Sequence, residues 1–172
     1  MTTLLLVRHG ETDWNASGRL QGHTDTPLND FGRRQARLLA DQLADDKLDA
    51  VFSSDLARAR ETAEIVGERL DLPVGVDSDL REKNWGNWEG LSWTERDAVE
   101  YVGESNEDHR DRMLAALRRI AEHHPGGRVL VVTHGGSMRR VQAAATGIAQ
   151  PVVENCGRWI CVWEDGGPRA VD

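Results

Sequence analysis

Two stretches of the sequence share one form: LLLVRHG at residues 4–10 and VLVVTHGG at residues 129–136. Each is a run of four apolar residues that leads, one residue later, into His-Gly. Uninterrupted Leu- and Val-rich runs are typical of strands buried on both faces, as in parallel sheets. Ligands bind outside the carboxyl ends of such strands. If the two strands are parallel, His9 and His134 therefore stand on one edge of the sheet.

Strand and helix patterns alternate along the chain around these two stretches. The predicted strands lie at residues 3–7, 50–52, 73–76, 128–132 and 159–163. The predicted helices lie at residues 31–45, 55–70 and 105–124, and from Ser137, as a capping residue, to near Gly147. This alternation predicts an α/β fold, a three-layer α/β/α sandwich around a mostly parallel central sheet. No linker or repeat divides the chain, so we expect residues 1–172 to form a single domain.

Two long polar segments, residues 10–30 and 81–104, do not fit a strand or helix pattern. Long loops in a compact domain are usually functional or disordered. Both segments are rich in Gly and Asn and contain tryptophan, which argues against disorder. They are therefore the predicted location of ligand-binding residues.

The charge balance limits the classes of partner. The chain has 21 Lys and Arg against 29 Asp and Glu, a formal net charge of −8. This disfavours nonspecific binding to nucleic acid or to an anionic membrane, and we expect neither as a partner. No apolar run approaches the roughly 20 residues of a spanning helix, and no signal peptide precedes the first strand. These features predict a cytoplasmic protein.

The pattern of the last strand bears on assembly. Trp159 and Trp163 alternate along it, so their side chains lie on one face. We interpret them as core residues. An edge that pairs with a second copy, giving a homodimer, is the alternative.

Arginines stand beside the predicted ligand edge. Arg8 precedes His9, and Arg58 falls in the first turn of a helix that we expect Ser53-Ser54-Asp55 to cap. A cation there is disfavoured by about 0.3–1 kcal/mol, and a broken local rule suggests function. Arg58 could clamp an anion together with Arg8. Three other arginines are interpreted as solvated side chains: Arg60, Arg139 and Arg140.

Two histidines and two arginines at one edge predict a phosphate ligand, because the planar guanidinium donates two parallel hydrogen bonds to phosphate oxygens. An imidazole among arginines is held neutral by repulsion between like charges, so it is a competent nucleophile near pH 7. The sequence has neither the carboxylate clusters that hold Mg²⁺ nor a zinc-ligand spacing. We therefore predict a phosphohistidine intermediate without a metal or other cofactor.

A leaving alkoxide also needs a proton donor. The candidates are Glu82 and Glu89 in the segment LREKNWGNWEG at residues 80–90. Glu82 follows the third strand closely, and spacing favours it modestly. Desolvation by Trp85 and Trp88 would favour its protonated form, although we interpret these tryptophans mainly as loop packing.

Several motifs resemble the histidine phosphatase superfamily, also called phosphoglycerate mutase-like. They are RHGET at residues 8–12, LQG at 20–22, TPLN at 26–29, SSDLARARETA at 53–63, LRE at 80–82, GES at 103–105 and THGG at 133–136. The resemblance implies that His9 is the phosphorylated nucleophile, that Glu82 is the proton donor, and that Arg8, Arg58 and His134 complete the phosphate pocket. It also implies that further residues line the pocket: Asn15, Gln21, Gly22 and Gly135.

The segment at residues 94–102 departs from the family pattern. Family members usually have a longer helical insert there, and this sequence also ends without the tail typical of the mutases. The remaining segment reads as an acidic, open cover. We therefore predict a phosphomonoesterase that acts on a small phosphorylated metabolite, with the natural substrate left open. A phosphoglycerate-type mutase is the first alternative, and a non-catalytic phospholigand-binding module is the second.

Overall fold

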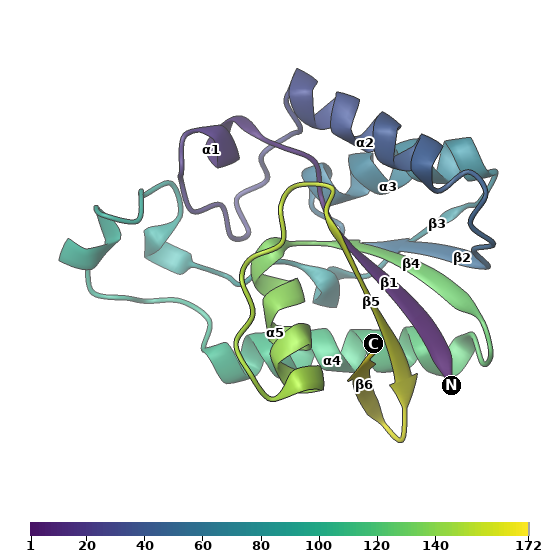
Figure 1. The fold of residues 1–172 in the computed structure, drawn as a ribbon. Helices are drawn as coiled ribbons and strands as arrows, with labels where there is room; N and C mark the ends of the chain where they lie inside the picture. Colours follow the sequence, from purple (N-terminus) through teal and green to yellow (C-terminus); the bar gives the residue numbers. More distant parts are fainter. Residues whose placement is uncertain (172) are drawn as a thin grey trace.

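A six-stranded sheet forms the centre of the computed structural model, which describes residues 1–171 (Figure 1). The strands are β1 (Thr2–Arg8), β2 (Ala50–Ser53), β3 (Val74–Val76), β4 (Arg128–Thr133), β5 (Arg158–Glu164) and β6 (Gly167–Ala170). Their order across the sheet is β3-β2-β4-β1-β5-β6. The strands β3, β2, β4 and β1 run parallel to one another. The strand β5 is antiparallel to β1, and β6 is antiparallel to β5. The expected mostly parallel sheet is confirmed.

Helices cover both faces of the sheet, as the sandwich prediction requires (Figure 1). They are α1 (Asp13–Ala16), α2 (Asp30–Gln42), α3 (Ala57–Leu70), α4 (Asn106–His123) and α5 (Gly135–Thr146). Alternate residues of β1 point to opposite sides. Leu5 and Val7 pack with α2 and α3, while Leu4 and Leu6 pack with α4 and α5. Both faces of the central strands are therefore buried, which explains their continuous apolar runs.

Two local expectations are wrong, and one strand was not predicted. The unpredicted strand, β6, pairs with β5 as an antiparallel hairpin. The helix α5 begins at Gly135 with His134 as its N-cap, because the Ser137 hydroxyl donates to the Arg81 carbonyl oxygen at 3.0 Å and is not free to cap. The helix α3 has Leu56 as its N-cap and lacks a side-chain cap, since Asp55 binds Arg81 instead.

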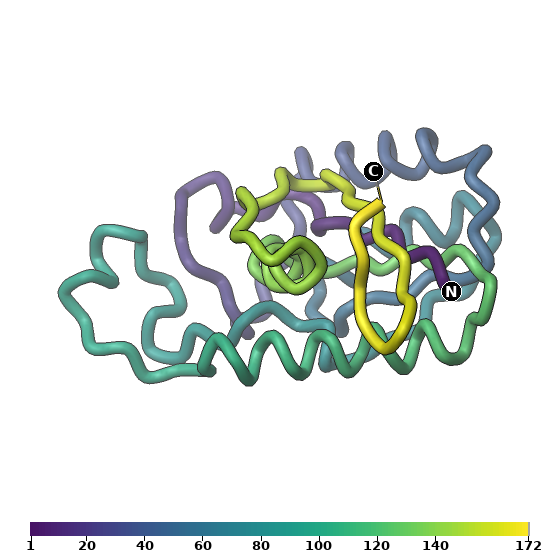
Figure 2. Tube along the Cα trace, turned by 60° about the horizontal axis from the view of Figure 1, so that its bottom comes forward, coloured from purple at the N-terminus to yellow at the C-terminus, as the bar shows by residue number. Residues whose placement is uncertain are grey.

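The two long polar segments lie side by side beyond the carboxyl ends of the parallel strands (Figures 1 and 2). The amide of Leu20 donates to the Leu91 carbonyl at 2.9 Å, and the amide of Gly90 donates to the Leu20 carbonyl at 2.8 Å. An isolated bridge joins Arg19 to Ser92. These contacts place residues from both segments over the edge of the sheet.

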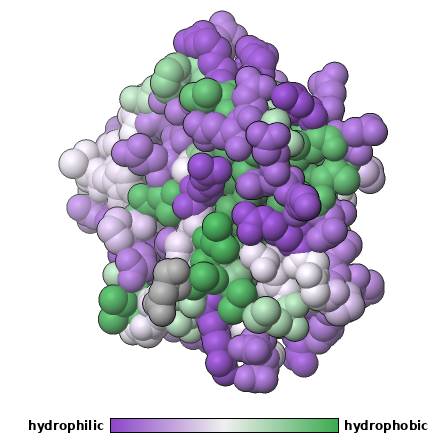
Figure 3. All heavy atoms as spheres, turned by 45° about the vertical axis from the view of Figure 1, so that its right-hand side comes forward, coloured by the Kyte–Doolittle hydropathy of each residue, from purple (hydrophilic) through white to green (hydrophobic). Residues whose placement is uncertain are grey.

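The core includes the two tryptophans of the last strand. Trp163 is buried and Trp159 packs partly buried against the same apolar cluster, as expected for core residues. The face shown in Figure 3 is mostly hydrophilic, with apolar side chains between charged ones. Within residues 1–171, no helix is both long enough and apolar enough to cross a membrane.

Candidate active site

His9 and His134 meet at the carboxyl edge of the sheet. The strands β1 and β4 are parallel neighbours, with Arg8 in register with Thr133, so each histidine stands one residue beyond the paired strands. The ring centroids lie 5.2 Å apart and the ring planes are inclined by 60°. Both side chains are buried. The structure thus brings together two histidines that are separated by most of the chain.

His9 is in the form that a nucleophile requires. Its Nδ1 lies 2.6 Å from the carbonyl oxygen of Gly10. Because a carbonyl only accepts, Nδ1 carries the proton and Nε2 keeps its lone pair. Burial, followed by the charges of Arg58 and Arg8, holds the pKa of His9 well below its ordinary value of 6.5. The imidazole is therefore neutral near pH 7 and able to attack phosphorus.

Arg58 is buried in the first turn of α3, with 1 % of its surface exposed. Its Nη1 and Nη2 donate to the carbonyl oxygens of Thr24 at 3.0 Å and Gly22 at 2.7 Å. Burial lowers the pKa of Arg58 to about 10, which leaves it charged at neutral pH. Among residues 1–171, neither Arg58 nor Arg8 forms an ion pair with a carboxylate. Arg58, which is buried, and Arg8, which is half-buried, have no anionic partner and so form a site for an anion.

Unsatisfied polar atoms gather at the same place. In the described part of the chain, five buried side-chain nitrogen or oxygen atoms have no hydrogen-bond partner. Four of them belong to this site: Nε of Arg8, Nε of Arg58, Nδ1 of His109 and Nδ1 of His134. Such atoms are costly to bury unless a ligand or water binds them. Their concentration here indicates where a polar ligand sits.

Glu82 lines the same pocket as His9. Its carboxylate accepts hydrogen bonds from the amides of Lys83 and Gly136, each at 2.9 Å. The second donor belongs to the first turn of α5, where the helix dipole favours a negative charge. The same carboxylate lines the pocket that His9 lines. Its position suits a group that exchanges a proton with a substrate oxygen.

Glu89 has a different role. It does not line the pocket. Its carboxylate accepts from the amides of His23, Thr24 and Trp85 at 2.8–3.2 Å, and from the Thr24 hydroxyl. These bonds tie the two long segments together. The geometry therefore favours Glu82 over Glu89 as the proton donor. Sequence spacing had given Glu82 only a modest preference.

The remaining predicted site residues also line the pocket: Asn15, Gln21, Gly22 and Gly135. The Thr12 backbone N–H and hydroxyl donate to the side-chain oxygen of Asn15, and the Thr12 hydroxyl also donates to the side-chain oxygen of Gln21. The side-chain NH₂ groups of Asn15 and Gln21 are therefore left for other partners. Gly22 has φ of +56°, a backbone conformation that favours glycine. At Gly135 a Cβ would come within 2.7 Å of a Val152 methyl group.

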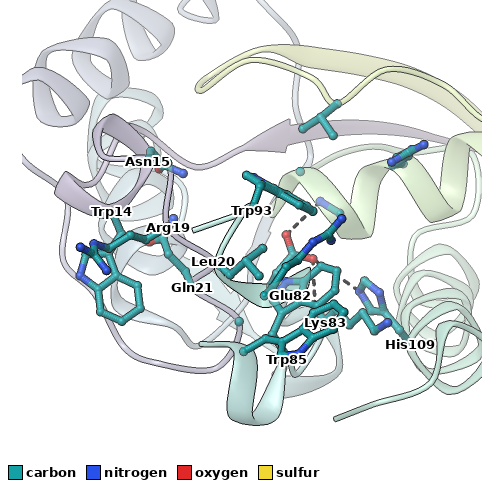
Figure 4. A pocket seen from close by; sticks show the side chains of 18 of the residues that line it. Trp14, Asn15, Arg19, Leu20, Gln21, Glu82, Lys83, Trp85, Trp93 and His109 are labelled. Carbon is teal, nitrogen blue, oxygen red and sulfur yellow. Dashed lines mark hydrogen bonds and ion pairs between the residues drawn. The ribbon is translucent and has the colours of Figure 1, made fainter. Parts of the chain in front are cut away.

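One wall of the pocket, which has a volume of about 710 Å³, is aromatic. Trp85 and Trp88 stack with centroids 6.1 Å apart, and Trp93 and Tyr101 meet them edge-on or tilted. These four residues are the aromatic lobe. They pack against one another, as expected, but they also face the pocket. Figure 4 shows Trp85 and Trp93 on either side of Glu82.

The cover at residues 94–102 is not simply acidic toward the pocket. It contains a single 3₁₀ turn, Arg96–Ala98. Arg96 lies over the Trp93 ring at 4.1 Å and over Trp88 at 5.3 Å, and it lines the pocket. Glu95 turns back to accept from the Ser92 amide. The positive charge of the cover therefore faces inward.

Similarity to known proteins extends along nearly the whole chain. The model of the histidine phosphatase superfamily (branch 1) matches residues 4–172. The chain belongs to the histidine phosphatase superfamily. It is 40 % identical over 168 residues to phosphoglycerate mutase-like protein 4 of Arabidopsis thaliana, covering 87 % of this chain and 73 % of the relative.

A further relative and a solved structure are similar to this histidine phosphatase, and the relative is named as a phosphatase. Glucosyl-3-phosphoglycerate phosphatase of Mycolicibacterium vanbaalenii is 35 % identical over 192 residues, covering 97 % of this chain and 85 % of the relative. The structure of YhfR from Bacillus stearothermophilus superposes with a TM-score of 0.91 at 33 % identity, covering 99 % of this chain and 95 % of the other. The chain is a phosphatase of this superfamily.

His109 is a site residue of this histidine phosphatase that sequence reasoning missed. Its Nε2 lies 2.9 Å from the Ser137 hydroxyl and 3.8 Å from a Glu82 oxygen. Because Ser137 donates its own proton to a carbonyl, Nε2 is the donor to Ser137. Burial lowers the pKa of His109 to about 4. A signal was available, since His109 continues the buried face of α4 at four-residue spacing from Met113 and Leu117.

Arg139 and Arg140 both line the pocket of this histidine phosphatase. Arg139 is exposed, as expected for a solvated side chain, whereas Arg140 is half-buried. Arg140 donates to the Asn106 side-chain oxygen at 2.7 Å. Their position follows from α5, which starts at the sheet edge and runs along the pocket wall. Arg60 is the solvated arginine expected, paired on the surface with Glu64.

Among residues 1–171, no group of three or more His, Cys, Asp or Glu side chains is arranged to hold a metal ion. Metal independence remains a prediction.

Proposed function

We propose that this phosphatase hydrolyses small phosphate monoesters through a phosphohistidine on His9, without a metal ion. The observation that carries the proposal is one pocket lined by His9, whose Nε2 lone pair is free, by Arg8 and Arg58, which form no ion pair, and by Glu82. The arginines bind the phosphate oxygens, and the imidazole supplies the nucleophile.

The first step transfers the phosphoryl group to the enzyme. His9 Nε2 forms a bond to phosphorus as the bond from phosphorus to the ester oxygen breaks. The Glu82 carboxyl group gives a proton to that leaving oxygen, so an alcohol departs. Arg8, Arg58 and His134 hold the other three phosphate oxygens while charge redistributes among them.

The second step returns the enzyme to its starting state. The Glu82 carboxylate takes a proton from a water molecule, whose oxygen attacks phosphorus. The bond from phosphorus to His9 breaks, and inorganic phosphate leaves. Both steps use one carboxyl group in opposite directions, which is why a single Glu facing His9 suffices.

A mutase is the second candidate, since one relative is named phosphoglycerate mutase-like. A mutase must keep water from the phosphohistidine while the substrate reorients. The cover at residues 94–102 is short and mostly exposed, which supports access of water and therefore hydrolysis. A time course with 3-phosphoglycerate, following 2-phosphoglycerate and free phosphate together, separates the two. Isomer formation that outruns phosphate release would replace hydrolysis by mutase activity.

The decisive experiment combines a phosphometabolite panel with a labelling assay. We expect wild type to release phosphate from several small esters and to acquire an acid-labile, base-stable label from radioactive substrate phosphate. His9→Ala should lose both properties and keep its melting temperature. His123→Ala, which removes a surface histidine at the end of α4, is the matched control. Near-normal turnover by folded His9→Ala would overturn the mechanism.

A further inference from the structure

His109 is a buried histidine that the proposed reaction steps leave unused. It lies on the buried face of α4, four residues before Met113, and 1 % of its surface is exposed. An apolar side chain would fill this position without burying a polar group. Within residues 1–171 the Nδ1 atom of His109 has no hydrogen-bond partner, which makes an imidazole costly here. A local rule broken in this way suggests a function.

The other ring nitrogen of His109 is a donor that lies between two acceptors. Its Nε2 donates to the Ser137 hydroxyl oxygen at 2.9 Å, and Glu82 Oε1 lies 3.8 Å from the same nitrogen. Ser137 is not the donor in the first contact, because its own proton goes to the Arg81 carbonyl oxygen. Figure 4 shows His109 beside Glu82 on the wall of the pocket. A small turn of the imidazole therefore brings its Nε2–H group to Glu82.

The Glu82 side chain has room for this further hydrogen bond. Its Oε1 accepts from the Lys83 amide and its Oε2 from the Gly136 amide. A carboxylate offers about four acceptor positions, and a protonated carboxyl group offers fewer. The two amides belong to the backbone, so they act on Glu82 whether or not it holds a proton. The Nε2–H of His109 is on a side chain and is able to move.

His109 is neutral near pH 7, so it can give Glu82 a hydrogen bond but no proton. Burial lowers the pKa of His109 to about 4. His134, which also acts on this group, is held neutral because burial keeps its pKa well below 6.5. Charged neighbours partly cancel, since two glutamates raise the pKa of His109 and two arginines lower it: Glu82, Glu104, Arg112 and Arg140.

We propose that His109 is a positioning residue for the Glu82 proton: its Nε2–H group binds Ser137 while Glu82 is protonated, and turns to the carboxylate once the proton has left. This inference rests on the proposed function, in which Glu82 protonates the leaving oxygen. A hydrogen bond to a carboxylate is stronger than one to a hydroxyl. The exchange is therefore favoured only after Glu82 has become negatively charged.

The proton itself moves only between Glu82 and the reacting oxygens. In the first step the O–H bond of Glu82 breaks and an O–H bond forms on the departing alcohol. In the second step a water molecule returns a proton to Glu82, and the Nε2–H group returns to Ser137. The N–H bond of His109 stays intact throughout. Because hydrogen bonding to the charged form favours that form, His109 helps Glu82 to give up its proton.

The test compares His109→Gln with His109→Met. Glutamine keeps an N–H donor near the position of Nε2, and methionine has none, while both are good helix formers. The measurement is kcat/KM against pH with glycerol 3-phosphate, whose alkoxide needs the proton. In His109→Met the fall at high pH, where Glu82 has lost its proton, should move upward by about one pH unit, a tenfold change in the protonation equilibrium. His109→Gln should keep the wild-type profile.

Two controls separate this role from packing. With p-nitrophenyl phosphate the leaving group needs no proton, so His109→Met should change kcat/KM little. A packing defect would instead lower kcat/KM for both substrates alike and leave the pH of the fall unchanged, which would overturn the proposal. His123→Met removes an exposed histidine from the end of the same helix and should leave both profiles as in wild type.

Ser137→Ala tests the proposal from the other side. It removes the competing acceptor, so the Nε2–H group is always free for Glu82, and the fall at high pH should move downward. The Arg81 carbonyl oxygen stays hydrogen-bonded in this variant, because Arg112 Nη1 also donates to it at 2.9 Å. A fall at the wild-type pH in Ser137→Ala would overturn the proposal, even if His109→Met did not fold.

A nuclear magnetic resonance titration measures the same effect without turnover. In protein with isotope-labelled glutamate, the carboxyl carbon signal of Glu82 is identified by its absence from Glu82→Gln. This signal should titrate at higher pH in His109→Met than in wild type and His109→Gln. Equal titration in these proteins would overturn the role of His109 and leave the phosphatase proposal intact. A shifted titration in a wild-type protein that releases no phosphate would overturn the phosphatase proposal alone.

Discussion

The two sides of the pocket are built in opposite ways. Arg8, His9, Arg58 and His134, which we propose bind the phosphate, lie at strand ends or a helix start, and all but Arg8 are buried almost completely. We call them the phosphate edge. The aromatic lobe stands on a long segment with only short 3₁₀ turns, and half of the Trp93 surface is exposed.

This difference separates two tasks. Parallel strands hold side chains at their carboxyl ends in fixed relation, because each strand is hydrogen-bonded on both sides. Groups that must align with a reacting phosphorus belong there. A loop tolerates exchange of side chains without loss of the sheet, so the part of the pocket that meets the rest of the substrate can differ while the chemistry is kept. Glu82 stands where the two sides join.

The largest effect on activity is expected for a substitution of Glu82, which stands between the two sides of the pocket. Glu82→Gln should lower kcat for alkyl phosphates by about 10²–10⁴-fold, the typical contribution of a general acid. With p-nitrophenyl phosphate the loss should be much smaller, because that phenolate leaves without a proton. Parallel rate measurements with both substrates check this. Glu89→Gln should affect both substrates alike, since its bonds hold the loop. A substrate-selective loss in Glu89→Gln, absent from Glu82→Gln, would move the acid to the other carboxyl group.

The next effect concerns the phosphate edge. Arg58→Met should lower kcat/KM by about 10²–10³-fold, as does loss of one charge-stabilising donor in other enzymes. Arg60→Met removes the neighbouring charge from the surface of the same helix and should have little effect. Comparable losses in the two variants would show that Arg58 acts only through the general charge of the protein.

The pH dependence of Arg58→Met sharpens the same comparison. In wild type the pKa of His9 is well below 6.5. His9 therefore stays unprotonated and active when the pH falls from neutrality to just below 6.5. The acidic limb of kcat/KM should therefore lie below pH 6.5. Arg58 is the second cause of the lowered pKa, after burial. Its removal should raise the pKa of His9 and shift the acidic limb to higher pH, and an unchanged limb would contradict this.

Changes in the aromatic lobe should be smaller. Trp93→Ala should reduce kcat/KM by less than about tenfold, mainly through KM, because it removes contact with the rest of the substrate and not with the phosphate. Phe31→Ala removes an exposed ring on α2 that does not line the pocket, and serves as the control. A large fall in kcat for Trp93→Ala would show that the lobe takes part in the chemical step.

Metal removal should have the smallest effect. The phosphate edge supplies its positive charge from arginines, so dialysis against EDTA is expected to leave activity unchanged. Activity assays before and after dialysis, with Mg²⁺ added back, check this. Strict dependence on an added divalent ion would contradict the metal-free mechanism.

Much of the phosphate edge could be predicted because its signals are local. Each apolar run and the His-Gly after it are contiguous in the sequence. Because ligands bind at the carboxyl ends of parallel strands, this pattern predicts that both histidines lie at the ligand site. The aromatic lobe could not be derived in this way. Its four rings come from a segment without regular periodicity, and only contacts such as that of Trp88 with Tyr101 define its shape.

The sequence by itself determined the order of strands and helices, the two histidines at one edge and the resemblance to a phosphatase superfamily, because these depend on neighbouring residues. The tertiary structure alone decided which carboxylate lines the pocket with His9, since the amide that binds Glu82 comes from Gly136, 54 residues away. It alone placed His109 beside Glu82 and brought Lys83 and Arg140 onto Asn106. Contacts between residues so far apart in the chain depend on how α4 and α5 pack against the sheet, and no local pattern encodes that packing.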